Sequence, residues 1–158
     1  MNKKHAYQCT IEWTGNNGSG TTSYTSYNRN HTVSVTSKVD LECSSDPMFR
    51  GDGTKYNPED LFLSSISSCH MLWYLHLCAD AKVNVVEYKD TCEGILTLEQ
   101  NGSGKFETIT LYPSIVVEDV SMIEKANELH EIAHSYCFIA QSVNALIEIK
   151  PHIVAFKS

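Results

Sequence analysis

The sequence predicts an α+β domain with the element order βββ-α-ββ-α-β. Two clear helix starts, at Asn57 and Ser121, flank a pair of β-rich runs that meet at the turn Asn101–Gly104. Because these elements form no βαβ repeat, a doubly wound parallel sheet is excluded. The 158 residues, 42% apolar and 20% charged, are ordinary for a globular chain and sufficient for one core. We therefore expect a single domain over residues 1–158.

The N-terminal part predicts three short strands. Tyr7–Trp13 alternates between polar and apolar residues, and His31–Thr36 and Val39–Cys43 are similarly rich in β-favouring residues. The turn Asn16–Gly20 leads into Thr/Ser/Tyr-rich sequence that could pair back on the first strand. Residues 44–57 hold a proline and two glycines, which predicts a loop.

The first helix has a well-marked start. Asn57 can cap it, Pro58 suits the first helical position, and Glu59 and Asp60 favour the positive end of the helix dipole. The apolar pattern predicts that this helix runs to about Asp80.

The second half continues with a β-hairpin. Val83–Gln100 and Lys105–Glu118 are β-rich, and the Asn-Gly-Ser-Gly sequence between them is a strong turn signal. Ser121 and Glu124 form a capping box, which predicts a second helix running towards Asn144. The last strand is expected over 145–156, with Pro151 indicating an edge or a bulge.

Composition excludes several classes of protein. The formal net charge of −7, without a local Lys/Arg cluster, argues against nucleic-acid binding. The most apolar stretch, Leu61–Leu77, holds four serines and two histidines and is too polar to span a membrane. No apolar region follows the basic start, so we expect no signal peptide and a cytoplasmic location. Six cysteines without a Cys-x-x-Cys pair are then best explained as reduced thiols, most of them inert core residues.

Cys69 lies in the middle of the first helix. This helix is apolar on almost every side, which predicts burial all round, and its interruptions are small serines at 64, 65, 67 and 68. Buried hydroxyls need partners, so the serines suggest a polar pocket inside the core. A packed core thiol is the simplest interpretation of Cys69. However, the second helix carries Cys137 in a similar apolar setting, and two helices on one sheet face could bring the two sulfurs together.

These features in combination resemble the OsmC/Ohr family, the osmotically inducible and organic-hydroperoxide-resistance proteins. The resemblance rests on Asn-Pro-Glu opening a helix, a cysteine ten positions after that glutamate, a hairpin, and a later helix with a second cysteine. The segments FRGDGTKYNPEDLFLSSISSCHMLWYLH and AHSYCFIAQSVN look like the OsmC-like branch in particular. The resemblance implies antiparallel sheets wrapped around two central helices in an intertwined homodimer.

The resemblance also implies a cysteine-based peroxidase. Cys69 matches the peroxidatic cysteine, Cys137 the resolving cysteine and Glu59 the active-site glutamate. Of the two arginines in the chain, Arg29 matches the thiolate partner better, and Arg50 is its competitor. A guanidinium beside a thiol favours the nucleophilic thiolate, whose oxidation gives a sulfenic acid that a second thiol resolves as a disulfide.

The remaining expectations concern substrate and partners. We expect a preference for organic hydroperoxides, no bound cofactor or metal, an external dithiol reductant and shared active sites in a homodimer. Phe138 follows Cys137 where the organic-hydroperoxide branch is expected to have proline, which leaves the substrate open. Residues expected to line the substrate pocket are Phe49, Arg50, Phe62, Trp73 and Phe138.

Two other functions are compatible with the residues. His130, His134 and Cys137 are spaced to share one helix face and could bind zinc, with Cys69 or His70 as a fourth ligand. The chain could also be a non-catalytic ligand-binding protein. Its apolar pocket would then be lined by Phe62, Met71, Trp73, Tyr136 and Phe138.

Overall fold

The computed structural model describes residues 3–156. Contacts within the chain divide it into two compact units, Met1–Leu61 and Phe62–Ser158. The α+β class is confirmed, with three strands before the first helix, a hairpin after it, and a second helix before the last strands. The expectation of one domain over the whole chain stays a prediction.

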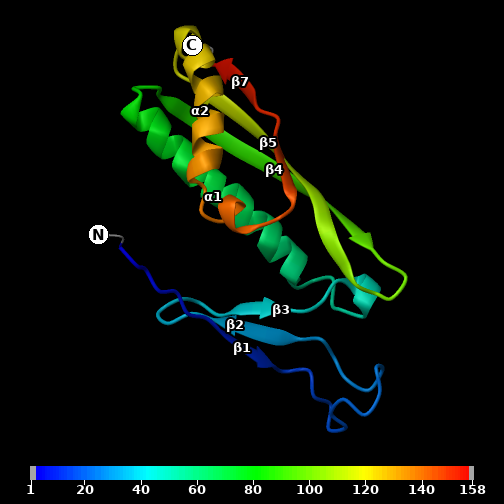
Figure 1. Cartoon of the computed structure of the whole chain (residues 1–158). Coiled ribbons are helices and arrows are strands. Elements are labelled where there is room, and N and C mark those ends of the chain that lie inside the picture. Colours follow the sequence, from blue (N-terminus) through cyan, green and yellow to red (C-terminus); the bar gives the residue numbers. More distant parts are fainter. Residues whose placement is uncertain (1–2, 157–158) are drawn as a thin grey trace. The chain divides into compact units, whose positions relative to one another are not determined.

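The first unit contains a three-stranded antiparallel sheet made of β1 (Thr10–Trp13), β2 (His31–Ser34) and β3 (Leu41–Cys43) (Figure 1). β1 pairs with β2, and Thr10 lies opposite Ser34. Residues 21–27 form turns and bends, so the expectation that they pair back on the first strand is wrong. The sheet is closed by a longer loop instead, in which the Trp13 indole donates to the Asn28 carbonyl at 2.8 Å.

Helix α1 (Pro58–Asp80) begins and ends where the sequence predicts. The Asn57 side chain accepts a hydrogen bond from the Asp60 amide at 2.7 Å. The Asp60 carboxylate accepts one in return from the Asn57 amide at 3.2 Å. This reciprocal cap satisfies two backbone donors that the first helical turn leaves without partners.

The sheet of the second unit is built on the predicted hairpin. β4 (Val85–Leu98) and β5 (Gly104–Val117) pair antiparallel, and Gly102 in the turn has a φ of 86°. β6 (Leu146–Ile149) and β7 (His152–Ala155) both run parallel to β5, so this sheet is mixed and not purely antiparallel. The predicted last strand is thus broken in two at Pro151, because proline cannot donate to the ladder.

Helix α2 (Ile123–Tyr136) differs from its prediction at both ends. The 3-10 turn η2 (Val120–Met122) leads into it, and Asp119 caps this turn by accepting from the Ser121 amide at 2.9 Å. The cap is therefore Asp119, not Ser121. The helix ends at Tyr136 and does not continue towards Asn144, because Cys137 has extended backbone angles. A second short turn, η3 (Ala140–Ser142), follows.

Both helices of the second unit pack against β5. One core cluster joins Tyr74 and Cys78 of α1 to Leu129 of α2 and to Ile115 and Val117 of β5. A second cluster joins the first half of α1, through Ile66, to Ile109 and Leu111 of β5. Figure 1 shows α1 and α2 crossing one another along this sheet.

The burial of α1 is narrower than its apolar sequence predicts. Its buried residues form one stripe at every fourth position: Ile66, His70, Tyr74 and Cys78. Leu72, on another side of the helix, is 63% exposed. A single chain therefore does not bury this helix all round, since it covers one stripe with its own sheet and α2.

The helix serines also differ from expectation. Ser65 and Ser68 donate to the carbonyls of Phe62 and Ser65 in the preceding turn. Ser67 donates to the Asp90 carboxylate on β4. Two of these hydroxyls thus bond within the helix and the third bonds to β4, so the three do not line a polar pocket.

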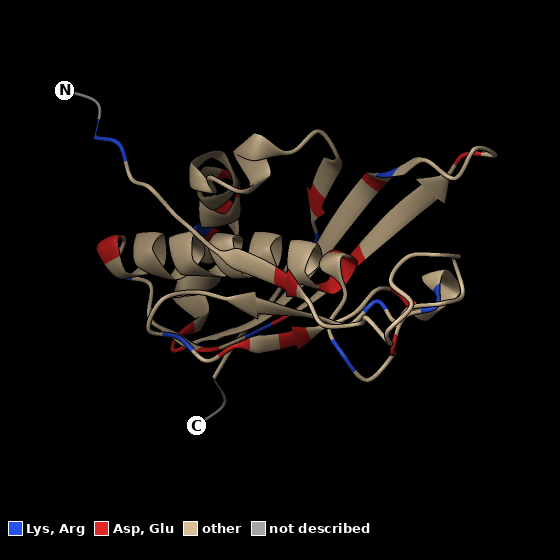
Figure 2. Ribbon diagram, turned by 90° about the horizontal axis from the view of Figure 1, so that it is seen from below, with Lys and Arg blue, Asp and Glu red and all other residues tan. Residues whose placement is uncertain are grey.

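The distribution of charge and the character of the helices agree with what the composition predicts. Acidic positions recur along the ribbon and outnumber basic ones, 19 to 12 in the sequence (Figure 2). Among the helices of the described residues, none has the length and apolar character needed to cross a bilayer.

Candidate active site

The thiols of Cys69 and Cys137 meet inside the second unit. Cys69 lies in the middle of α1 and is half-buried, whereas Cys137 is fully buried at the C-terminal cap of α2. Burial, and hydrogen bonding of the protonated thiol to Cys69, raise the pKa of Cys137 to about 11. Both cysteines are free thiols. The arrangement can therefore interconvert between a dithiol and a disulfide without bringing in a third sulfur.

The end of α2 points the Cys137 thiol inward. The Cys137 amide donates to the Ala133 and His134 carbonyls, while its own carbonyl accepts from the Gln141 amide at 3.0 Å. The Ala140 amide lies 3.4 Å from the Cys137 sulfur. The backbone on both sides of Cys137 is thus held, which fixes the direction of its Cα–Cβ bond.

A buried histidine pair joins the two helices that carry the cysteines or lead up to them. His70 Nε2 and His130 Nδ1 are 3.0 Å apart, and the two rings are only 11° from parallel. The Tyr74 ring stacks on His130 with its centroid at 4.0 Å. Burial lowers the pKa of His70 to about 4 and that of His130 to about 3, so both rings are neutral at physiological pH.

The bond between His70 and His130 argues against a zinc site that uses His130. The His130 nitrogen that faces α1 is already bonded to His70. Within residues 3–156, no group of three or more His, Cys, Asp or Glu side chains is placed to hold a metal ion. The sequence suggests both histidines only as metal ligands, and their contact with each other could not be predicted from it because the contact joins residues 60 positions apart.

Aromatic side chains gather next to the cysteine pair. Trp73, one helical turn after Cys69, lies 5.0 Å from the Tyr136 ring and 5.6 Å from the Phe138 ring, measured between centroids. Phe138 is 65% exposed and Tyr136 is 52% exposed. An apolar surface therefore begins directly at the residues that flank the two thiols.

Phe62 lies in a different environment. Its ring packs on Phe106, with 5.2 Å between centroids. It lines a cavity of about 460 Å³ together with Lys105, Val143 and Asn144. Two of the predicted pocket residues of the second unit, Trp73 and Phe138, thus lie together, and Phe62 does not join them.

Arg29 is firmly held in the first unit. Its guanidinium carbon lies 4.3 Å from the ring centroids of both Tyr24 and Tyr27. Its two terminal nitrogens donate to the carbonyls of the same two tyrosines, at 2.7 and 2.6 Å. Two hydrogen bonds and two cation–π contacts fix the guanidinium in position while leaving further N–H donors for an anion.

The competing arginine is held differently. Arg50 ends the turn η1 (Pro47–Phe49) with a left-handed φ of 67°, and it is exposed. Phe49 is partly buried, and its carbonyl accepts from the Tyr24 hydroxyl at 3.4 Å. The Phe49 backbone is thereby tied to the loop that holds Arg29.

Glu59 stands in the first turn of α1, where its charge suits the helix dipole. Its Oε2 atom is buried and has no hydrogen-bond partner within residues 3–156. Along one continuous helix, ten residues separate Glu59 from Cys69 by about 15 Å. Glu59 and Cys69 of the same helix are therefore too far apart for direct contact.

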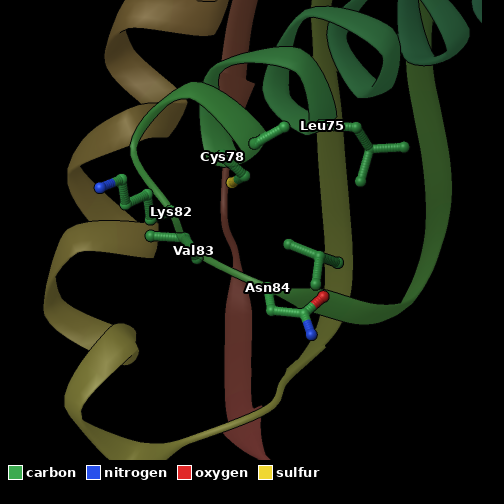
Figure 3. Close-up of a pocket in the computed structure, with 7 residues that line it drawn as sticks. Leu75, Cys78, Lys82, Val83 and Asn84 are labelled. Carbon is green, nitrogen blue, oxygen red and sulfur yellow. The ribbon is translucent and has the colours of Figure 1, made fainter.

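A further cavity, of about 430 Å³, lies at the C-terminal end of α1. Figure 3 shows Leu75, Cys78, Lys82, Val83 and Asn84 around it. Burial raises the pKa of the Cys78 thiol, so its reactive thiolate is suppressed. Burial likewise raises the pKa of Cys43 and that of Cys92, the latter to about 11. These three thiols behave as core residues.

Several solved structures are similar to this chain. An OsmC-like protein of unknown function from Vibrio cholerae is 26% identical over 96% of this chain and 100% of its own, with a TM-score of 0.82. An organic hydroperoxide resistance protein from Elizabethkingia anophelis is 22% identical over 99% and 100% of the two chains, with a TM-score of 0.70. A putative organic hydroperoxide resistance protein from Vibrio cholerae, with captopril bound in one active site, is 24% identical over 97% and 95%, with a TM-score of 0.67.

The family comparison agrees with these neighbours. No curated protein matches the sequence. The family model of the OsmC-like proteins matches residues 51–152, which include α1, the hairpin, α2 and both cysteines of the pair. The chain therefore belongs to the OsmC-like protein family.

Proposed function

We propose that this chain is a thiol-dependent peroxidase that uses Cys69 as the nucleophile and Cys137 as the resolving cysteine. The observation that carries the proposal is the contact between these two thiols in the second unit. A sulfur that attacks a peroxide needs a second thiol within reach to escape over-oxidation. Cys69 and Cys137 have that relationship, whereas Cys43 and Cys78 are buried in the core and Cys9 is exposed.

The reaction proceeds in three steps. The Cys69 thiolate attacks one oxygen of the hydroperoxide, the O–O bond breaks, and the alcohol leaves with a proton while Cys69 becomes a sulfenic acid. The Cys137 thiolate then attacks the Cys69 sulfur, and the disulfide forms as the hydroxyl group of the sulfenic acid leaves with a proton as water. An external dithiol reduces the disulfide by exchange and is itself oxidised. No cofactor is needed, because the two electrons come from the thiols.

Arg29 is the proposed partner of the Cys69 thiolate, as the family resemblance assigns it. Its guanidinium is held by Tyr24 and Tyr27, which supports this role over that of the exposed Arg50. A fixed cation stabilises a thiolate at a smaller entropic cost than a mobile one. Glu59 would orient the arginine through its buried carboxylate oxygen, which has no hydrogen-bond partner among residues 3–156.

Organic hydroperoxides are the proposed substrates. Trp73 and Phe138 flank the two cysteines and present aromatic surface to an alkyl chain. Apolar surface stabilises such a chain, whereas hydrogen peroxide gains nothing from it. Two of the structural neighbours are named organic hydroperoxide resistance proteins, which is consistent with this substrate class.

A steady-state assay tests the function. We expect faster turnover with tert-butyl hydroperoxide than with hydrogen peroxide, and faster turnover with a dithiol reductant than with a monothiol. Equal or better efficiency with hydrogen peroxide would overturn the substrate class. A Cys69 thiol that reacts with no peroxide at neutral pH would overturn the enzyme and favour a ligand-binding protein.

A further inference from the structure

We propose that His70 and His130 are positioning residues, which hold α1 and α2 in the register at which Cys137 can reach oxidised Cys69. The inference rests on the proposed function, since it concerns the step that forms the disulfide. Neither histidine touches the reacting atoms in this proposal. Each acts through the cysteine on its own chain segment.

The contact between the rings is directional. Two nitrogens at 3.0 Å, with rings 11° from parallel and centroids 5.3 Å apart, describe two imidazoles joined edge to edge by one hydrogen bond. Tyr74, one turn after His70 on α1, covers the His130 ring at 4.0 Å. His130 is thus fixed by a bond at its edge and by a ring against its face, both supplied by α1.

The two histidines lie close in the chain to the cysteines whose distance they would set. His70 follows Cys69 directly in the chain, and His130 precedes Cys137 by seven residues, or about two turns of α2. The buried face of α2 consists of Ala126, Leu129, His130 and Ala133, so Leu129 is its one large aliphatic side chain. Small side chains interlock weakly, so the hydrogen bond adds a constraint on sliding that packing alone does not supply.

The pair is costly for stability, which argues against a purely structural role. His70 Nδ1 and His130 Nε2 are buried without a hydrogen-bond partner in the described part of the chain. Whichever nitrogen carries the shared proton, one buried donor and one buried acceptor are left over. Each such group is destabilising, and an apolar pair of the same size would avoid this cost. Unlike two leucines, the two imidazoles fix the distance between α1 and α2 at this point through their hydrogen bond.

That distance matters for the disulfide. A disulfide requires its two sulfurs at about 2.05 Å with a narrow range of torsion angles. A small shift of α2 along α1 would move Cys137 out of that range and lower its effective concentration towards Cys69. Sulfenic acid would then persist and react with a second peroxide to give sulfinic acid.

Side-chain amides provide the sharpest test. Glutamine places its amide where histidine has Nε2, and asparagine places it where histidine has Nδ1. His70→Gln and His130→Asn should therefore keep the bond. The swapped variants, His70→Asn and His130→Gln, have the same amide group but place it at the wrong distance from the partner ring. His70→Leu and His130→Leu remove the bond altogether. Val117→Ala, on β5 in the core cluster that contains Tyr74 and Leu129, controls for lost stability.

The primary measurement is the equilibrium between the Cys69–Cys137 dithiol and disulfide in glutathione buffers. We expect His70→Asn, His130→Gln and both leucine variants to lower the equilibrium constant for disulfide formation at least about tenfold, which raises the reduction potential by about 30 mV. His70→Gln, His130→Asn and Val117→Ala should stay within about threefold of wild type. After one addition of tert-butyl hydroperoxide, mass spectrometry should show more sulfinic acid in the first group only.

These measurements distinguish a failure of the positioning role from a failure of the proposed peroxidase function. Equal constants for the two amides at each position, with all folded variants near wild type, would overturn the positioning role. Should the leucine variants fail to fold, the amide pairs still decide. If Cys69 reacts with no peroxide in wild type, the proposed function fails, while the glutathione equilibrium still reports on the histidine pair.

Discussion

The Cys137 thiol donates a hydrogen bond to Cys69 from the C-terminal cap of α2. Cys137 lies just past the last helical residue, Tyr136, and has extended backbone angles. This placement leaves its backbone held on both sides but its χ1 free of the steric restrictions of a helix interior. A cysteine at a helix end can rotate towards a neighbouring thiol without unwinding the helix.

The cysteine variants separate the two proposed roles. We expect Cys69→Ser to abolish peroxide reduction, because a hydroxyl is a far weaker nucleophile than a thiolate. Cys137→Ser should complete one turnover and then stall with Cys69 as sulfenic or sulfinic acid. Single-turnover and steady-state assays with mass spectrometry measure both. Cys78→Ala is the control and should change stability only; substantial turnover by Cys69→Ser would refute the nucleophile assignment.

The resolution step should depend steeply on pH. With a pKa of about 11, Cys137 is almost entirely protonated at pH 7, and its thiolate fraction grows about tenfold per pH unit up to about pH 10. Because the thiolate is the attacking species, the rate of disulfide formation should rise by about the same factor. Trp73 fluorescence in a Trp13→Phe background, which leaves one tryptophan, can follow it by stopped flow.

Two observations check this pH dependence. The phase assigned to disulfide formation must vanish in Cys137→Ser. A rate that stays constant between pH 7 and 9 would contradict a protonated resolving thiol.

The histidine pair predicts a loss of stability in mild acid. The pKa values of His70 and His130 are about 4 and 3 in the fold, against about 6.5 when unfolded. Between these values the unfolded chain binds more protons, so stability rises with pH and falls as pH drops below 6.5. At pH 5 each histidine should cost about 2 kcal/mol relative to neutral pH.

Urea unfolding at pH 7 and pH 5 measures this effect. The double variant His70→Leu/His130→Leu lacks both titrating groups and should lose less stability over the same interval. An equal loss in wild type and double variant would show that the buried pair does not carry the acid sensitivity.

The features that could be predicted from the sequence depend on neighbouring residues, and those that could not depend on contacts between distant parts of the chain. The start of α1 was predictable because Asn57, Pro58 and the acids that follow are local signals, and the hairpin because Asn101–Gly104 is a short turn. The parallel pairing of β6 and β7 with β5 was not predictable, since it depends on where α2 returns the chain. The same holds for His70 and His130, whose contact spans 60 positions. Cys69 was singled out mainly through the family resemblance.

The turn that leads into α2 is capped by Asp119 and not by Ser121 as predicted, and this difference can be tested. Asp119 accepts from both the amide and the hydroxyl of Ser121, at 2.9 and 2.6 Å. Asp119→Ala should therefore destabilise the protein by about 1 kcal/mol, as expected for a lost cap. Ser121→Ala removes only an exposed side-chain contact and should cost less. Chemical denaturation compares them; a larger loss from Ser121→Ala would restore the capping box that the sequence predicted.

The last prediction is a homodimer with shared active sites. α1 leaves apolar surface uncovered, including Leu72 at 63% exposure, and Glu59 lies about 15 Å from Cys69 along the same helix. An antiparallel packing of α1 against its copy would cover this surface and bring the partner subunit's Glu59 towards Cys69. Light scattering should then give a dimer, and a fully active monomer would rule out this arrangement.

Mixing inactive variants tests the sharing directly. Under subunit exchange, Cys69→Ser and Glu59→Ala chains form heterodimers in which one site has both Cys69 and Glu59 intact. An equal mixture should then recover about a quarter of wild-type activity, because half the dimers are mixed and each has one of two sites. Cys69→Ser mixed with Cys137→Ser is the matched control. These two cysteines meet within one chain, so no heterodimer rebuilds the pair and sustained turnover should not return. Recovery in neither mixture would mean that each chain uses its own Glu59 or none, and recovery in both would mean that the disulfide forms between subunits.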